Sequence, residues 1–112
     1  MVARDVSEAD WKTFRELREF ALERFCSRVL DELETLRLDA SRSQHERYLA
    51  VYRLVQDRDQ ELAHAFNGPR RSQMIMQLAA IYGHGLLEPG EFSRFTPQTR
   101  ASIELLTNTF PR

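Results

Sequence analysis

Two residues three positions apart, Glu61 and His64, have the spacing of a metal-binding pair on a helix. Such residues share one helix face, and the di-iron centres of helical bundles use this Glu-x-x-His pattern. A complete centre also needs a second such motif and two further glutamates that point into the core, and this chain has only one motif. The helical wheel places Glu61, His64 and Asp57 on the solvent side of their helix. We therefore predict no metal and no other cofactor.

The cluster Arg70-Arg71-Ser72 opens a predicted helix and could bind an anion. Two cations at a helix N-terminus oppose the helix dipole, so another interaction is needed to hold them there. One candidate is a phosphate or carboxylate bound by the free amides of the first turn, the Ser72 hydroxyl and both guanidinium groups. The alternative, which we favour, is that either arginine pairs with an acidic residue of the first or second helix.

Nucleic acid is not an expected partner of this chain. Its 16 basic and 17 acidic residues leave a net charge of -1, and a pair of arginines is too small to contact a duplex. The helix that follows Arg71 is mostly Met, Ile, Leu and Ala, whereas a helix that reads DNA needs several polar side chains facing the bases. Binding of an anion or nucleic acid through Arg70 and Arg71 is therefore kept only as the alternative function.

One arginine, Arg18, and one aspartate, Asp59, lie on the apolar stripes of the first and second predicted helices. Charged side chains are almost never fully buried unless they are paired. If these helices form an antiparallel hairpin that turns near residue 40, the two residues lie about one turn apart, within reach of an arginine side chain. We predict a structural ion pair that fixes the register of the hairpin. The alternatives are a ligand cavity lined by Asp59 and ordinary solvent exposure.

Other residues that could act as nucleophiles or bases occur singly. Cys26 lies at the edge of an apolar stripe, where a free cysteine is usually a small core residue. His45 lies inside a predicted helix cap, and His84 lies between two glycines at a helix end. The chain has neither a Gly-x-Ser-x-Gly motif nor a glycine-rich phosphate loop. We predict no catalytic residues and no enzymatic activity.

The first predicted helix covers residues 7–37. Ser7 can cap its first turn, and Asp10 stands where a capping box has its reciprocal acidic residue. No Gly or Pro interrupts this helix. Three large apolar residues lie off its main apolar stripe, so the helix needs more than one neighbour. They are Leu17, Phe20 and Leu30.

The second predicted helix begins at Ser43, which can form a capping box with Glu46. It ends at Asn67-Gly68-Pro69, because Gly68 can adopt a left-handed conformation and Pro69 cannot continue the hydrogen-bond ladder. Apolar residues recur along it at spacings of three and four, which predicts one core-facing stripe. The stripe consists of Tyr48, Tyr52, Val55, Leu62 and Phe66.

The rest of the chain carries three shorter helical signals. Pro69 can open a third helix that runs to Gly83, a short turn follows at residues 88–95, and Thr96-Pro97 opens a last helix. No alternating run predicts a strand. The connections are short, so consecutive helices are expected to pack antiparallel.

One stretch, residues 78–92, resembles a known bacterial module. Its sequence LAAIYGHGLLEPGEF follows the helix, Gly-Leu-Leu turn and Glu-Phe helix of the short C-terminal (SHOCT) oligomerisation module. The stretch lacks the paired acidic residues and the lysine-rich second helix of that family. We therefore transfer no residue roles from it and do not assign the chain to the family.

Composition predicts a cytoplasmic protein without a membrane partner. A single cysteine cannot form an internal disulfide, the N-terminus has no apolar run, and no segment approaches the roughly 18 apolar residues of a membrane span. All basic residues except Lys12 are arginines, which we interpret as the codon bias of a GC-rich bacterial genome.

These observations together predict an all-α fold: a compact bundle of four to five helices in a single domain over residues 1–112. Its long first helix would form an antiparallel hairpin with the second. Large apolar residues on several sides of the first helix, together with Phe92, Phe95 and Phe110, exceed what three short partner helices can cover. We therefore expect a protein-interaction or regulatory module that acts as a homodimer or binds another protein.

Overall fold

A computed structural model describes residues 6–109, and these residues form helices and no strand. The predicted all-α fold is confirmed. Phe110, one of the aromatic residues counted above, lies outside the described residues. No helix within residues 6–109 is long and apolar enough to cross a membrane. The elements are α1 (Glu8–Arg37), α2 (Gln44–Phe66), a 3-10 helix η1 (Arg71–Gln73), α3 (Met74–Gly83), α4 (Pro89–Phe92) and α5 (Pro97–Thr109).

The two long helices begin at the residues that the sequence indicates. The Ser7 hydroxyl accepts a hydrogen bond from the Asp10 amide at 3.0 Å, and Ser43 and Glu46 form the full capping box of α2. Asp10 does not complete a capping box at α1, because its carboxylate is bound by donors at the start of α5. After α2, Gly68 has a φ of 51°, so the left-handed turn that glycine favours is present.

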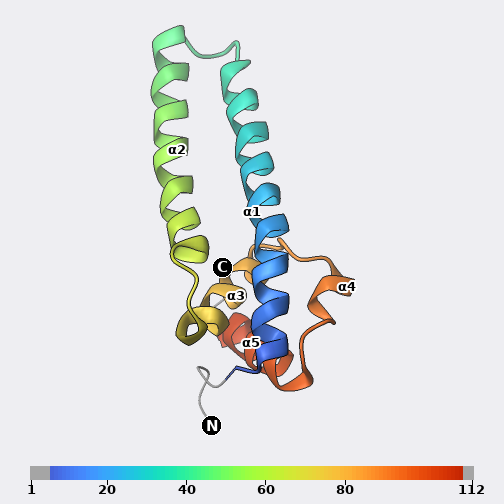
Figure 1. Cartoon of the computed structure of the whole chain (residues 1–112). Coiled ribbons are helices and arrows are strands. Elements are labelled where there is room, and N and C mark those ends of the chain that lie inside the picture. The colour runs from blue at the N-terminus through green and yellow to red at the C-terminus, as the bar shows by residue number, and fades with distance from the viewer. Residues whose placement is uncertain (1–5, 110–112) are drawn as a thin grey trace.

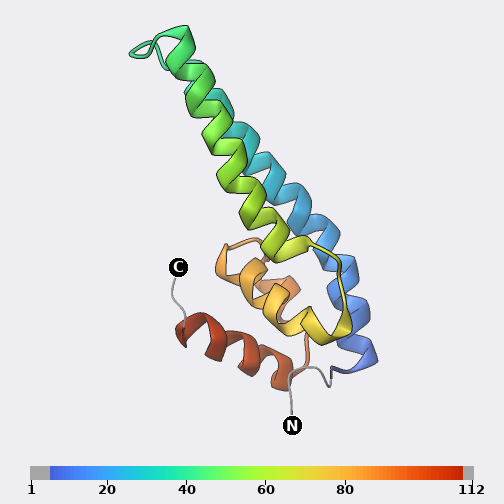
Figure 2. The same ribbon diagram turned by 90° about the vertical axis from the view of Figure 1, so that its left-hand side faces the viewer.

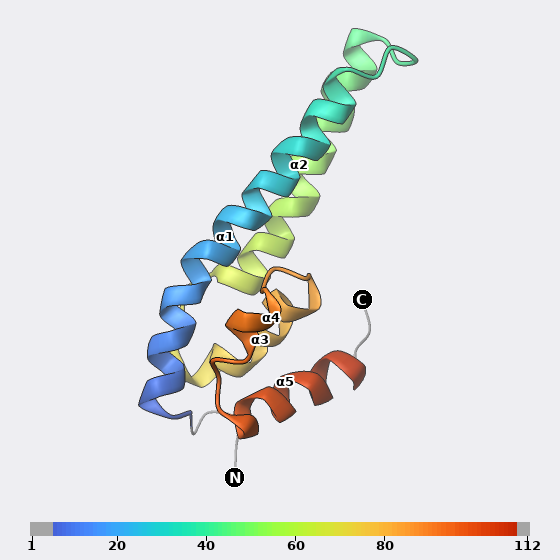
Figure 3. The same cartoon turned by 90° about the vertical axis from the view of Figure 1, so that its right-hand side faces the viewer.

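Helices α1 and α2 form a long antiparallel hairpin, as predicted, and the remaining helices gather at one end of it (Figure 1). We call this end the base. It contains α3, α4 and α5, packed beside the N-terminal half of α1 and the end of α2. Views from the two sides place the base on one side of the hairpin, while the turn at residues 38–43 lies far from it (Figures 2 and 3). The molecule measures 54 × 24 × 22 Å.

The hydrophobic core lies almost entirely in the base. Helix α1 contributes buried residues only as far as Phe25, and α2 contributes only Ala65 and Phe66. No residue from 26 to 64 is buried. The hairpin beyond the base is therefore a two-helix structure without a core of its own. The buried apolar residues are Phe14, Leu17, Ala21, Phe25, Ala65, Phe66, Met74, Ile75, Leu78, Ala79, Ile81, Leu86, Phe95 and Ile103.

Two arginines of α1 attach the hairpin to α4 and to the loop between α3 and α4. Arg24 binds both carboxylate oxygens of Glu91, at 2.6 and 2.9 Å, and also donates to the carbonyl oxygen of Leu86. Arg28 donates to the carbonyl oxygens of His84 and Gly85 at 2.6 and 2.7 Å. The second arginine thus satisfies carbonyl groups that the end of α3 leaves without helical partners.

The Arg24–Glu91 pair predicts a pH-dependent contribution to stability. The hydrogen bonds from Arg24 lower the pKa of Glu91 below its ordinary value of 4.5. A carboxylate with a lowered pKa stabilises the folded state fully above the unfolded pKa, and the stabilisation is lost as pH falls through the folded pKa. At pH 7 we expect Glu91→Gln to reduce the free energy of unfolding by about 1–2 kcal/mol.

The same reasoning gives the pH at which this difference disappears. The gap between Glu91→Gln and the unmodified protein should close as pH falls from about 5 to about 2, because Glu91 becomes protonated in both states. Urea unfolding followed by circular dichroism across this range measures the gap. A gap that stays constant down to pH 2 would show that the charge of Glu91 contributes nothing.

Candidate interaction surface

Arg18 and Asp59 do not meet, so the predicted ion pair between them is wrong. The Arg18 guanidinium donates to the carbonyl oxygen of Phe66, lies 5.8 Å from the centre of the Phe66 ring, and pairs with Glu19 at 3.3 Å. Asp59 is exposed and has no ion pair within residues 6–109. The last carbonyl groups of a helix lack helical partners and attract cations. Arg18 therefore joins α1 to α2 by binding a backbone carbonyl group at the C-terminal end of α2.

Of the predicted anion cluster, Arg71 is already engaged inside the molecule. Its guanidinium pairs with Glu8 at 2.9 Å and lies 5.4 Å from the centre of the Trp11 ring. This is the ion pair with the first helix that the sequence favoured. Arg70 and Ser72 are exposed, so the cluster retains one uncommitted arginine rather than the two that the anion site requires.

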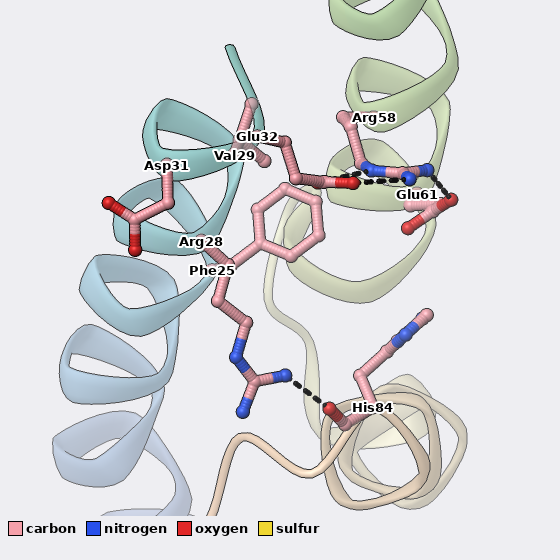
Figure 4. A pocket seen from close by; sticks show the side chains of 8 residues that line it. All are labelled: Phe25, Arg28, Val29, Asp31, Glu32, Arg58, Glu61 and His84. Carbon is pink, nitrogen blue, oxygen red and sulfur yellow. Dashed lines mark hydrogen bonds and ion pairs between the residues drawn. The ribbon is translucent and has the colours of Figure 1, made fainter. Parts of the chain in front are cut away.

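The structure does not bring the candidate metal pair, Glu61 and His64, into a group of metal-ligating side chains within residues 6–109. Glu61 pairs with Arg58 at 2.8 Å, and His64 is exposed. His84 lines an open pocket of about 610 Å³ between the hairpin and the end of α3, where Arg28 donates to the His84 carbonyl oxygen (Figure 4). Among the described residues, no group of three or more His, Cys, Asp or Glu side chains could hold a metal ion.

The inner seam of the hairpin contains several polar contacts among partly buried apolar residues. Arg58 of α2 binds both carboxylate oxygens of Glu32 of α1, at 2.9 and 3.0 Å, and also Glu61 (Figure 4). These hydrogen bonds lower the pKa of Glu32 and raise that of Arg58. Closer to the turn, Arg47 donates to the carbonyl oxygen of Arg37 at 3.1 Å. Arg47, Arg58 and Glu61 thus share the side of α2 that faces α1 with the partly buried Val51 and Leu54.

Only the end of the apolar stripe near the base meets the core, and the part from Tyr48 to Val55 is exposed, which corrects the prediction that the whole stripe is a core face. Of its five residues only Phe66 is buried. Tyr48 is 67% exposed, Tyr52 55% and Val55 46%. The spacing of three and four was a correct sign of an amphipathic helix. The sequence does not say which structure covers the apolar side.

The exposed stripe continues onto α1 and forms a single apolar side of the hairpin. Arg28 and Glu61 line the pocket on the base side. At about 100° per residue, Leu30 lies about 160° around α1 from Arg28, and Tyr52 lies about 180° around α2 from Glu61. Both residues therefore point away from the base. We call this side the open face. Its exposed apolar residues are Leu30 of α1 and Tyr48, Tyr52 and Val55 of α2. The partly buried Leu22, Cys26, Leu33 and Leu62 lie at its edge toward the seam between the helices, where Leu22, Cys26 and Leu62 pack against the core.

Exposure along the open face is high near its middle and toward the turn. Leu30 is 63% exposed, similar to Tyr48, while Leu22, Cys26, Leu33 and Leu62 are partly buried. Isolated exposed apolar residues are ordinary, but a contiguous apolar patch on one side of two helices marks an interaction surface. The open face is the strongest candidate functional site in residues 6–109.

Comparison with known protein families, with curated proteins and with solved structures found no match for this chain. The local resemblance of residues 78–92 to the SHOCT module is not supported by a match to any family. The functional argument therefore depends on the surface and on its chemistry.

Proposed function

We propose that this protein is an interaction module that forms a homodimer by packing the open faces of two hairpins against each other. The observation that carries the proposal is the absence of any buried residue between 26 and 64, although this segment holds most of the open face. A helix stripe that is apolar without a covering partner gains stability by burying it. Two such hairpins together make a four-helix bundle, in which each stripe becomes part of a core.

A second copy is the partner that fits the size and composition of the face. The face extends over about 30 Å of two adjacent helices and is about 20 Å wide, giving a projected area of roughly 600 Å². This is the lower end of specific interfaces, so we expect a dissociation constant in the micromolar range, on the order of 1–10 μM. The two tyrosines, Tyr48 and Tyr52, are of a type that contributes strongly to such interfaces.

The test compares two substitutions that add the same charge at equally exposed positions. Tyr52→Glu introduces a carboxylate in the middle of the open face, and Met76→Glu introduces one on α3, in the base; each original side chain is 55% exposed. We expect Tyr52→Glu to raise the dissociation constant at least about 100-fold, because a buried charge without a partner is costly. Met76→Glu should leave the constant unchanged within about threefold.

Sedimentation equilibrium measures this association directly. The unmodified chain of 13.2 kDa should approach twice that mass as its concentration rises through the micromolar range, and circular dichroism should show that both variants keep their helix content. A chain that remains at 13.2 kDa up to about 100 μM, or a Met76→Glu variant that dissociates as readily as Tyr52→Glu, would contradict the proposal.

A further inference from the structure

We infer that the part of the hairpin far from the base, residues 30–61, opens as a unit while the base stays folded, and that association of two copies holds it closed. We call this part the distal hairpin. The inference rests on the proposed homodimer, because closure is assigned to the packing of two open faces. Its basis is the distribution of buried contacts along α1 and α2.

The distal hairpin lies outside the hydrophobic core. Along the hairpin, contact with the core ends at Val29 of α1 and resumes at Leu62 of α2. Among the described residues, no apolar side chain from 30 to 61 packs against the core. Figures 1 and 3 show this part of the two helices projecting beyond the base. Its stability therefore depends on contacts between α1 and α2.

The contacts inside the distal hairpin are partly exposed to water. Arg58 binds Glu32 across the seam, and Arg47 binds the carbonyl oxygen of Arg37. The side chains of Arg58 and Glu32 remain 30% and 44% exposed, and ion pairs at such positions stabilise a fold only weakly. The best covered apolar residues of this part are only partly buried; they are Leu33, Leu36, Leu49, Val51 and Leu54.

Helical segments of this length are not stable in water without packing. The distal hairpin contains residues 30–37 of α1, about two turns, whereas an isolated helix shorter than roughly 12–15 residues is marginal at best. It also contains residues 44–61 of α2. Most helix stability in proteins comes from packing of an apolar face, but the stripe of α2 from Tyr48 to Val55 is exposed. The distal hairpin therefore opens at low cost in a single chain.

The base keeps its contacts when the distal hairpin opens. Its core is built from α1 as far as Phe25, the end of α2 and the helices that follow. Arg18 still binds the carbonyl oxygen of Phe66, and Arg24 still binds Glu91, because both contacts lie on the base side of Val29. Opening of one contiguous segment around an intact core is a general mode of local unfolding.

Association acts on this opening because the exposed part of the open face belongs to the distal hairpin. Its four exposed apolar residues, Leu30, Tyr48, Tyr52 and Val55, all lie within residues 30–61. An opened hairpin does not present them on one surface, so only the closed form associates. A partner that binds one of two states shifts the equilibrium toward that state. The closed form is thus favoured as more of the chain becomes dimeric.

Amide hydrogen exchange measures the opening in a single chain. In Tyr52→Glu, which the proposed homodimer makes monomeric, amides of the distal hairpin should exchange at least about 100-fold faster than the buried amides of α3. The open form should make up only roughly 1–5% of the molecules, so the helix content measured by circular dichroism is kept.

The dependence of exchange on protein concentration measures closure by association. In the unmodified chain, exchange in the distal hairpin should slow about tenfold as the concentration rises from about one tenth of the dissociation constant to about 100 times it. Met76→Glu is the matched control and should show the same slowing, because Met76 lies in the base. Tyr52→Glu should show none.

A substitution in the base tests whether the two parts open separately. In the Tyr52→Glu background, Asp10→Ala should speed exchange in α3 and α5 about 100-fold, because it removes the carboxylate that joins α1 to α5. Thr99→Val removes one donor to Asp10 and is the milder variant, with an expected increase of about tenfold. Neither should change exchange in the distal hairpin by more than about threefold. Asp31→Ala, at an exposed carboxylate, should change neither part by more than this.

The outcomes separate the two proposals. Fast exchange confined to the distal hairpin, together with slowing at high concentration, supports the inference. Equal exchange of the two parts in Tyr52→Glu, or equal acceleration of both by Asp10→Ala and Thr99→Val, overturns it while the proposed homodimer stands. A dimer whose distal hairpin exchanges at the same rate at every concentration also overturns it. A chain that stays monomeric overturns both.

Discussion

Asp10→Ala is expected to lower the free energy of unfolding by about 3 kcal/mol, a large part of the roughly 5–15 kcal/mol typical of a domain. The Asp10 carboxylate is 2% exposed and accepts hydrogen bonds from the Thr96 amide at 3.0 Å and from the hydroxyl groups of Thr96 and Thr99 at 2.7 and 2.6 Å. Alanine would leave these three donors without their acceptor, and the charge-assisted bonds that join α1 to α5 would be lost.

Urea unfolding followed by circular dichroism measures this loss, and Asp31→Ala provides the comparison. Asp31 is an exposed carboxylate in the same helix, so its removal should change the free energy of unfolding by no more than about 0.5 kcal/mol. Equal effects of the two substitutions would show that the Asp10 hydrogen bonds contribute little. Since Asp10 attaches the base to the start of α1, the expected loss affects the base before the hairpin.

The helices themselves were predictable because their ends depend on local chemistry. Ser7 and Ser43 satisfy amides of the first turns, and Gly68 and Pro69 stop α2, whatever the rest of the chain does. These local signals extend over three or four residues. They account for the agreement between the predicted and observed bounds of the hairpin.

The candidate site was only half predictable, because the sequence identifies an apolar stripe without identifying its neighbour. On α2 the stripe containing Tyr52 was expected to face α1. The structure instead turns Arg58 and Arg47 toward α1, where Glu32 and a backbone carbonyl bind them. The orientation of α2 about its own axis determines whether Tyr52 or Arg58 faces α1. That orientation depends on several polar contacts between residues far apart in the sequence.

The error over Arg18 and Asp59 has the same origin. Both residues were placed on core stripes, yet the stripe of α2 is exposed from Tyr48 to Val55, and Asp59 is exposed as well. Arg18 then finds a backbone carbonyl at Phe66, an acceptor that no side-chain pattern reveals. Asp59, displaced from the seam, is exposed to solvent.

Phe66→Ala is expected to be the most destabilising single substitution in the hairpin, with a loss of about 3–5 kcal/mol in the free energy of unfolding. The Phe66 side chain is 2% exposed, its ring lies 6.0 Å from that of Phe25, and the Arg18 guanidinium lies over it. It is one of only two buried residues of α2. Removing the ring creates a cavity where the hairpin meets the base and takes away the surface against which Arg18 packs.

Tyr52→Ala is the matched control, since it also removes an aromatic ring from α2 but at a position 55% exposed. Measured by urea unfolding at the lowest usable concentration, where linkage to association is smallest, it should cost less than about 1 kcal/mol. Phe66→Ala should also speed tryptic cleavage after Arg70 and Arg71, because the segment after α2 loses its anchor. If the two variants lose equal stability and Arg70 is cut no faster, Phe66 does not hold the hairpin to the base.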